Sequence, residues 1–102
     1  MDGVIRIDRV AAMLEVWLDA SFPFAKMKVK VLERSQGDFL AVPNLLYRDP
    51  DSGEIEYTSG LGDTVEEAVS DLLTRFVPEI RSHTKSGGLS EADFVWSASE
   101  DF

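Results

Sequence analysis

The sequence predicts a single α+β domain in which one helix packs across one face of an antiparallel sheet of three or four strands. Residues 25–33 and 39–42 alternate apolar and polar side chains, as half-buried strands do, whereas residues 64–76 repeat apolar side chains at helical spacing. The chain has 102 residues, enough for one hydrophobic core and too few for two. We place this core in residues 4–80 and treat residues 81–102 as an acidic, aromatic tail.

The best-specified element is the helix over residues 64–76. Asp63 or Thr64 can accept amide hydrogens of its first turn, and each is followed three residues later by a glutamate, as in a capping box. Pro78 is expected to end the helix because its ring is incompatible with a helix interior. The preceding Gly-Leu-Gly predicts a tight strand-to-helix turn. The apolar face of the helix comprises Val65, Ala68, Val69, Leu72, Leu73 and Phe76.

The N-terminal region predicts a second helix. Residues 1–7 fit either a strand or the lead-in to a helix, but from Asp8 onward apolar residues recur three and four positions apart. We therefore predict an N-terminal amphipathic helix that ends near residues 21–23. Together the two helices have more apolar surface than one small sheet face can cover, which predicts self-association. This stripe comprises Val10, Met13, Leu14, Trp17 and Leu18, with Met13 and Trp17 as the expected contacts in the core or in a homodimer.

The middle of the chain predicts two hairpins. Residues 26–31 alternate lysine with Met or Val, so we expect a strand with one buried face and a lysine face that meets solvent or protects an edge. A turn at residues 35–38 then leads into the antiparallel strand 39–42. Two further extended runs, at residues 45–48 and 54–58, flank the turn sequence DPDSG.

The charge distribution predicts a basic protein partner. The formal net charge is −9, and residues 37–102 carry four basic and fourteen acidic groups, which gives 4 − 14 = −10. Such a surface repels a phosphate backbone and attracts a basic protein, so direct nucleic-acid binding is disfavoured. An acidic surface can equally serve solubility alone.

Residues for catalysis or metal binding are scarce in this sequence. There is no cysteine, and the single histidine, His83, lies in a Ser-Lys-Gly region where no scaffold positions it as a base. The acids around the DPDSG turn do not have EF-hand spacing. We therefore predict a protein that is not an enzyme and that holds no metal or cofactor. Without cysteines, a leader or an apolar run of about 20 residues, the chain is expected to be cytoplasmic and not bound to a membrane.

The order of these elements resembles the HicB-like antitoxin domain. The similarity covers residues 28–76 and is carried by GDFLAVPNL, which begins at Gly37, and by GDTVEEA, which begins at Gly62. The resemblance implies a HicB-like or dsRBD-like arrangement of sheet and helix. It also implies a small acidic protein that neutralises a basic ribonuclease toxin, often as a dimer.

The function expected from charge and resemblance together is a protein-binding inhibitor of the antitoxin or immunity type. One alternative is a viral or mobile-element anti-defence protein, such as an anti-CRISPR, that imitates nucleic-acid charge. A second is a structural or oligomerisation domain without inhibitory activity. The expected partner-binding residues are Asp49, Asp51, Glu54 and Glu56 on the second hairpin and Glu91, Asp93, Phe94, Trp96, Glu100 and Asp101 in the tail. The two aromatic residues either anchor a partner or complete the core.

Overall fold

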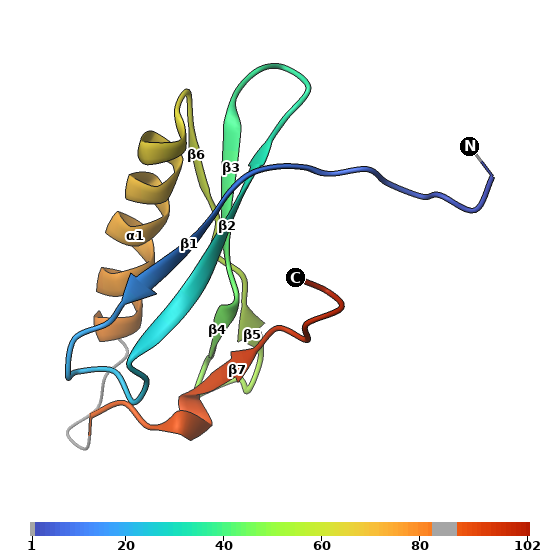
Figure 1. Ribbon diagram of the computed structural model, residues 1–102. Helices are drawn as coiled ribbons and strands as arrows, with labels where there is room; N and C mark the ends of the chain where they lie inside the picture. The colour runs from blue at the N-terminus through green and yellow to red at the C-terminus, as the bar shows by residue number, and fades with distance from the viewer. Residues whose placement is uncertain (1, 83–87) are drawn as a thin grey trace.

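The computed structural model describes residues 2–82 and 88–102 and has the predicted α+β architecture, with antiparallel sheets and a helix packed on one of them (Figure 1). His83 lies outside the described residues. The elements in chain order are β1 (Arg9–Trp17), β2 (Lys26–Glu33), β3 (Phe39–Pro43), β4 (Leu45–Arg48), β5 (Ile55–Glu56), β6 (Gly60–Gly62), α1 (Val65–Ser82), a 3-10 turn (Glu91–Asp93) and β7 (Phe94–Trp96).

The first sheet has the strand order β1-β2-β3-β6, and every neighbouring pair is antiparallel. The alternation predicted for β2 is confirmed, because Met27, Val29 and Val31 are buried and face α1 while the lysines between them point to the opposite face. We call the face covered by α1 the helix side and the opposite face the outer face. The core lies between the helix side of this sheet and α1.

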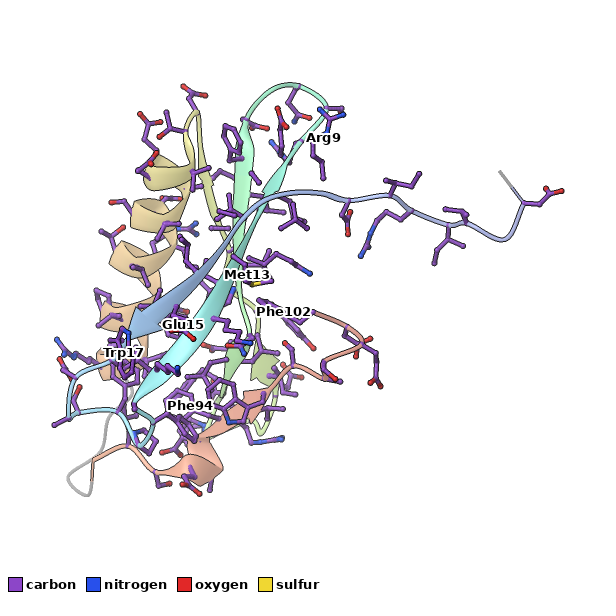
Figure 2. All side chains as sticks on the ribbon, in the orientation of Figure 1. Arg9, Met13, Glu15, Trp17, Phe94 and Phe102 are labelled. Atoms are coloured by element: carbon purple, nitrogen blue, oxygen red, sulfur yellow. The ribbon has the colours of Figure 1, made fainter. Side chains whose placement is uncertain are left out.

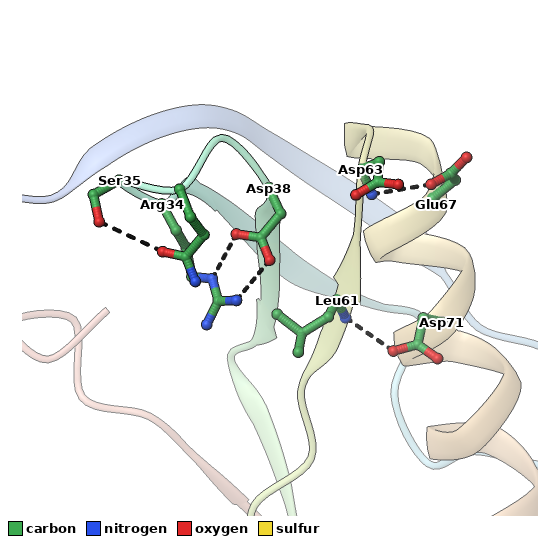
Figure 3. Close-up of polar contacts among 8 residues, drawn as sticks. Arg34, Ser35, Asp38, Leu61, Asp63, Glu67 and Asp71 are labelled. Carbon is green, nitrogen blue, oxygen red and sulfur yellow. Dashed lines mark hydrogen bonds and ion pairs between the residues drawn. The ribbon is translucent and has the colours of Figure 1, made fainter.

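The predicted helix is present and begins as expected. Thr64 Oγ1 accepts the amide hydrogen of Glu67 at 3.1 Å. The Glu67 carboxylate accepts the amide hydrogen of Asp63 at 3.0 Å, as Figure 3 shows. The prediction that Pro78 ends the helix is wrong, because α1 continues to Ser82. Ile80 is buried one turn beyond Phe76. Burial of this side chain compensates for the backbone hydrogen bond that proline removes.

Gly60 and Gly62 have a different role from the one predicted, because they form strand β6 and lie directly against α1. A side chain at Gly60 would collide with the Ala68 carbonyl and would meet Leu72 Cβ at 2.8 Å, and one at Gly62 would meet the Ala68 nitrogen at 2.5 Å. The absence of side chains therefore lets the strand backbone contact the helix backbone.

The predicted N-terminal amphipathic helix is wrong. The segment is strand β1, which pairs with β2 from Arg9↔Glu33 to Trp17↔Lys26. A β-bulge at Ala11 lies between the pairs Val10↔Leu32 and Ala12↔Val31. Residues 2–8 precede this strand as an extended arm that projects away from the body of the protein (Figure 1).

The tail contributes a strand to a second sheet. Its order is β5-β4-β7, and β7 pairs antiparallel with β4 through Leu45↔Trp96 and Tyr47↔Phe94. The predicted extended runs around DPDSG are confirmed as β4 and β5, although β5 is shorter than expected. The boundary drawn at residue 80 therefore does not separate core from tail, because Phe94 belongs to the core cluster.

Candidate functional site

The β4–β5 hairpin has a turn that is held by local hydrogen bonds. Asp49 Oδ1 accepts the amide hydrogens of Asp51 at 2.8 Å and Ser52 at 3.4 Å, and the Gly53 amide donates to the Asp49 carbonyl at 2.8 Å. Gly53 has a φ of 74°, a left-handed conformation that favours glycine. Asp49 therefore shapes the turn, while Asp51 and Glu54 extend from it into solvent.

The tail brings a further carboxylate to the same sheet. Asp93 Oδ2 accepts the amide hydrogen of Ser90 at 2.9 Å and its hydroxyl at 3.3 Å, which holds the 3-10 turn Glu91–Asp93 at the start of β7. Because β5 and β7 flank β4 on opposite sides, the hairpin acids and Asp93 come from segments about 40 residues apart in the chain and reach one end of the molecule.

Tyr47 lies between the segments that carry these carboxylates, because it pairs with Glu56 on one side and with Phe94, the neighbour of Asp93, on the other. Its side chain is buried in the second sheet, and burial raises the pKa of its hydroxyl above the ordinary value of 10.0. The negative charges of Asp93, Asp49, Glu56 and Asp51 raise this pKa further, in that order. We call Asp49, Asp51, Glu56 and Asp93 the acidic end. Four of the ten predicted partner-binding residues thus come from segments that meet at Tyr47.

The remaining predicted acids are arranged differently. Glu54 and Glu91 are exposed in the same two segments as the acidic end, but they are not among the groups that raise the pKa of Tyr47. Asp101 lies over the outer face of the first sheet, where it lines a groove of about 580 Å³ with Lys30 and Leu40. Glu100, its neighbour, is exposed. The predicted set therefore does not form a single surface.

Phe94 is not available to anchor a partner. It is only 7% exposed and packs against Phe22, Phe24 and Tyr47, with ring centroids 5.6–6.1 Å apart. Of the two roles considered from the sequence, Phe94 has the core one. Trp96 differs, since it packs edge-to-face on Phe24 at 4.9 Å yet remains 42% exposed.

Met13 and Trp17 lie on the outer face of β1 and not on a helix. Both are exposed, Met13 by 51% and Trp17 by 69% (Figure 2). Lys26 Nζ sits 4.9 Å above the Trp17 ring and pairs with Glu15 at 3.1 Å. On the same face, Lys30 lies 4.7 Å from the Phe102 ring and donates a hydrogen bond to the Phe102 carbonyl.

The sequence reasoning missed a groove on the helix side of the same strand. It has a volume of about 640 Å³ and runs between Leu14 of β1 and the side of α1 that bears Val65, Val69 and Leu73. The sequence does contain a signal for this groove, which is the wide apolar face predicted for α1. In the structure that face divides into a buried row, with Ala68, Leu72, Phe76 and Ile80, and a half-buried row that lines the groove.

Over residues 2–82 and 88–102, no three His, Asp or Glu side chains are grouped closely enough to hold a metal ion. In the same residues, no helix is both long and apolar enough to cross a membrane. Comparison with known proteins yielded no matching family model, no matching curated protein and no matching solved structure.

Proposed function

We propose that this protein is a protein-binding inhibitor of the antitoxin or immunity type, and that its acidic end contacts a basic, nucleic-acid-handling partner. The observation that carries the proposal is strand pairing in the second sheet, which brings the segments bearing Asp49, Asp51, Glu56 and Asp93 together beside Tyr47. Like charges repel one another, so gathering carboxylates on one surface costs stability in the free protein. Binding a cationic surface would relieve this repulsion and would speed association.

The neighbourhood of the acidic end supports this proposal. The hydrogen bonds of Asp49 and Asp93 to nearby backbone amides hold the two turns that carry these acids. Of the basic side chains, Arg48 lies closest in sequence, and its guanidinium donates to the Gly53 carbonyl at 3.1 Å. The acidic end therefore places four carboxylates on turns and strands that are held by local hydrogen bonds and strand pairing. Trp96 adds a partly exposed aromatic contact from the neighbouring strand β7.

The test compares two variants with the same net charge. The first replaces the acidic end by amides, which can still accept the hydrogen bonds that shape the turns: Asp49→Asn, Asp51→Asn, Glu56→Gln and Asp93→Asn. The control replaces four exposed acids elsewhere: Asp2→Asn, Asp63→Asn, Glu66→Gln and Glu79→Gln. Both variants and the parent chain are immobilised and used to capture proteins from an extract of the source cell.

A captured protein is then purified and its association rate is measured by stopped flow between about 50 and 300 mM salt. We expect the acidic-end variant to associate about tenfold more slowly at low salt and with a flatter salt dependence. The control variant should associate at a rate close to that of the parent chain. An inhibitor should also abolish the partner's activity on RNA or DNA at an equimolar ratio. Equal rates for the two variants, or a partner without basic character, would refute the proposal.

A further inference from the structure

Strand β1 has an edge that nothing in the described chain covers. It is nine residues long and pairs with β2 on one side only. Within residues 2–82 and 88–102, no hydrogen bond to its other side is found. A long edge strand of this kind presents backbone donors and acceptors that another strand can use. Natural sheets usually protect such edges with charges or proline; β1 has Arg9 and Glu15 near its two ends, but residues 10–14 between them contain neither.

The side chains next to this edge are apolar on both faces of the sheet. On the helix side, Leu14 is 36% exposed and forms one wall of the groove beneath Val69 and Leu73. On the outer face, Met13 and Trp17 are more exposed still (Figure 2). A strand added beside β1 would therefore bury apolar side chains on both faces, with its helix-side residues entering the groove under α1.

The arm that precedes β1 extends this open edge. Strand β2 ends at Glu33, opposite Arg9, so residues 4–8 have no strand of their own sheet beside them. Ile5 is fully exposed and Ile7 nearly so. Figure 1 shows the arm running from the N-terminus to the start of β1, away from the sheet. The isoleucines of this arm lack cover in a single copy of the chain, whereas Arg6 and Asp8 beside them form an ion pair.

We propose that the occupant of this edge is a second copy of the same chain, whose β1 pairs antiparallel with the first about a two-fold axis near the middle of the strand. The pairing would join two four-stranded sheets into one of eight strands. Only the antiparallel direction brings the arm of each copy to the far end of the other β1, where Trp17 is exposed. The same operation places Leu14 of each copy beside the groove of the other. Such an isologous interface closes on itself and leaves no free β1 edge.

The distribution of charge favours a second copy over a basic partner at this edge. Two chains with a net charge of −9 repel each other over most of their surfaces. Residues 1–36 are the exception, because six basic and five acidic groups give 6 − 5 = +1, against −10 for the rest of the chain. Two copies meet with least repulsion through this region. A basic partner is attracted to the acidic end instead, so this inference does not depend on the proposed function.

The first experiment measures the mass of the full chain by sedimentation equilibrium from about 1 to 200 μM, a range that brackets micromolar dimers. The test variant is Leu14→Glu, which would place two carboxylates in the paired interface. The control is Leu61→Glu on β6 at the opposite edge, where Leu61 is similarly exposed at 46%. We expect a dimer for the parent chain and the control, and a dissociation constant at least about tenfold higher for Leu14→Glu. Circular dichroism establishes that both variants are folded.

The second experiment tests the direction of pairing with single cysteines, which the natural chain lacks. Ala11→Cys, Ala12→Cys and Met13→Cys place a thiol near the expected two-fold axis, and Leu61→Cys serves as the control. A disulfide requires Cα atoms within about 7 Å, so only positions close to the axis can link two copies under mild oxidation. We expect a cross-linked dimer for at least one of the three β1 positions and a monomer for Leu61→Cys. A parent chain that stays monomeric at 200 μM, equal effects of the two glutamate variants, or cross-linking only at Leu61→Cys would each overturn the inference.

Discussion

The two edges of the first sheet are built in opposite ways. The β6 edge is three residues long, and its backbone is covered by side chains from α1. The Leu61 amide donates to Asp71 at 2.9 Å (Figure 3). Arg75 donates to the Ser59 carbonyl. The β1 edge is three times as long, and within the described residues no side chain bonds to its backbone. One edge is closed by the chain itself, and the other is left open.

This contrast indicates which edge of the first sheet is covered within a single copy of the chain. At the closed edge, the glycines of β6 allow close contact with α1, and the polar groups that this contact leaves unpaired are bonded by Asp71 and Arg75. At the open edge, α1 is displaced toward β6 and leaves a groove beside Leu14. Substitutions at the closed edge should therefore change stability, whereas those at the open edge should change association.

The largest effect is expected at Leu72, which is fully buried where α1 crosses the closed edge. Leu72→Ala should lower the free energy of unfolding by about 2–5 kcal/mol, because it leaves a cavity in the core. The matched control is Leu73→Ala on the half-buried row, for which a smaller loss is expected. Urea denaturation of both variants measures the difference. Equal losses would mean that the two rows of α1 are buried alike.

A second prediction concerns the close contact of β6 with the helix. Gly60→Ala should destabilise the protein by about 1–3 kcal/mol, because the new methyl group collides with the backbone of α1. Ser59→Ala, at the exposed residue before Gly60, is the control, because it adds no atom to the contact with α1. Thermal melting distinguishes the two. A Gly60→Ala variant that melts with the parent chain would contradict the closed-edge description.

The Asp71 carboxylate provides a pH-dependent test. Its pKa is lowered from 3.8, first by the Leu61 amide hydrogen bond and then by Arg75. A carboxylate whose pKa is lower in the folded than in the unfolded state contributes its full stabilisation when the pH is above its unfolded-state pKa. This contribution is lost as the pH falls through its folded-state pKa. Asp71→Ala should therefore melt below the parent chain at pH 7, by less than Gly60→Ala does. The difference in melting temperature between Asp71→Ala and the parent chain should narrow below pH 3.8.

The control for this pH series is Glu79→Gln, which removes an exposed carboxylate from the same helix. The difference in melting temperature between Glu79→Gln and the parent chain should not narrow in this way at low pH. A gap between Asp71→Ala and the parent chain that is constant over the whole pH range would show that the charge of Asp71 plays no part in closing the β6 edge.

The smallest effect on stability is expected at the open edge. Trp17→Ala removes an exposed ring and its contact with Lys26, so it should cost about 0.5 kcal/mol in dilute solution. If β1 edges pair, this loss should grow with protein concentration, because the parent chain gains stability from association. Tyr57→Ala removes a similarly exposed ring outside β1 and should show no concentration dependence. Thermal melts at about 2 and 200 μM compare the two variants.

Elements with strong local signals could be predicted from the sequence. The alternation of lysine with Met and Val in β2 is a two-residue period that requires no knowledge of its neighbours. The Asp63-Thr64 start of α1 likewise depends on hydrogen bonds within one turn. The sheet, its antiparallel hairpins and the helix across it follow from such segments. Self-association was predicted from the apolar surface of two helices, one of which is strand β1, and it stays a prediction.

Strand β1 was predicted wrongly for a physical reason. The bulge at Ala11 inserts one residue, so Val10 and Met13 both face outward although they are three positions apart. Leu14 faces the groove on the opposite side, next to Met13. A strand that is apolar on both faces and contains a bulge therefore imitates the three- and four-residue spacing of a helix. Pairing with β2 resolves this ambiguity.

The sequence by itself determined the capped helix, the alternating strands and the acidic charge, because each depends on residues close together in the chain. The tertiary structure decided which residues share a surface. Strands β6 and β7 are three residues long and have no period to detect, so they exist only through pairing with β3 and β4. The acidic end and the open β1 edge arise in the same way. A surface joins segments that are distant in sequence, and no local pattern encodes their distance in space.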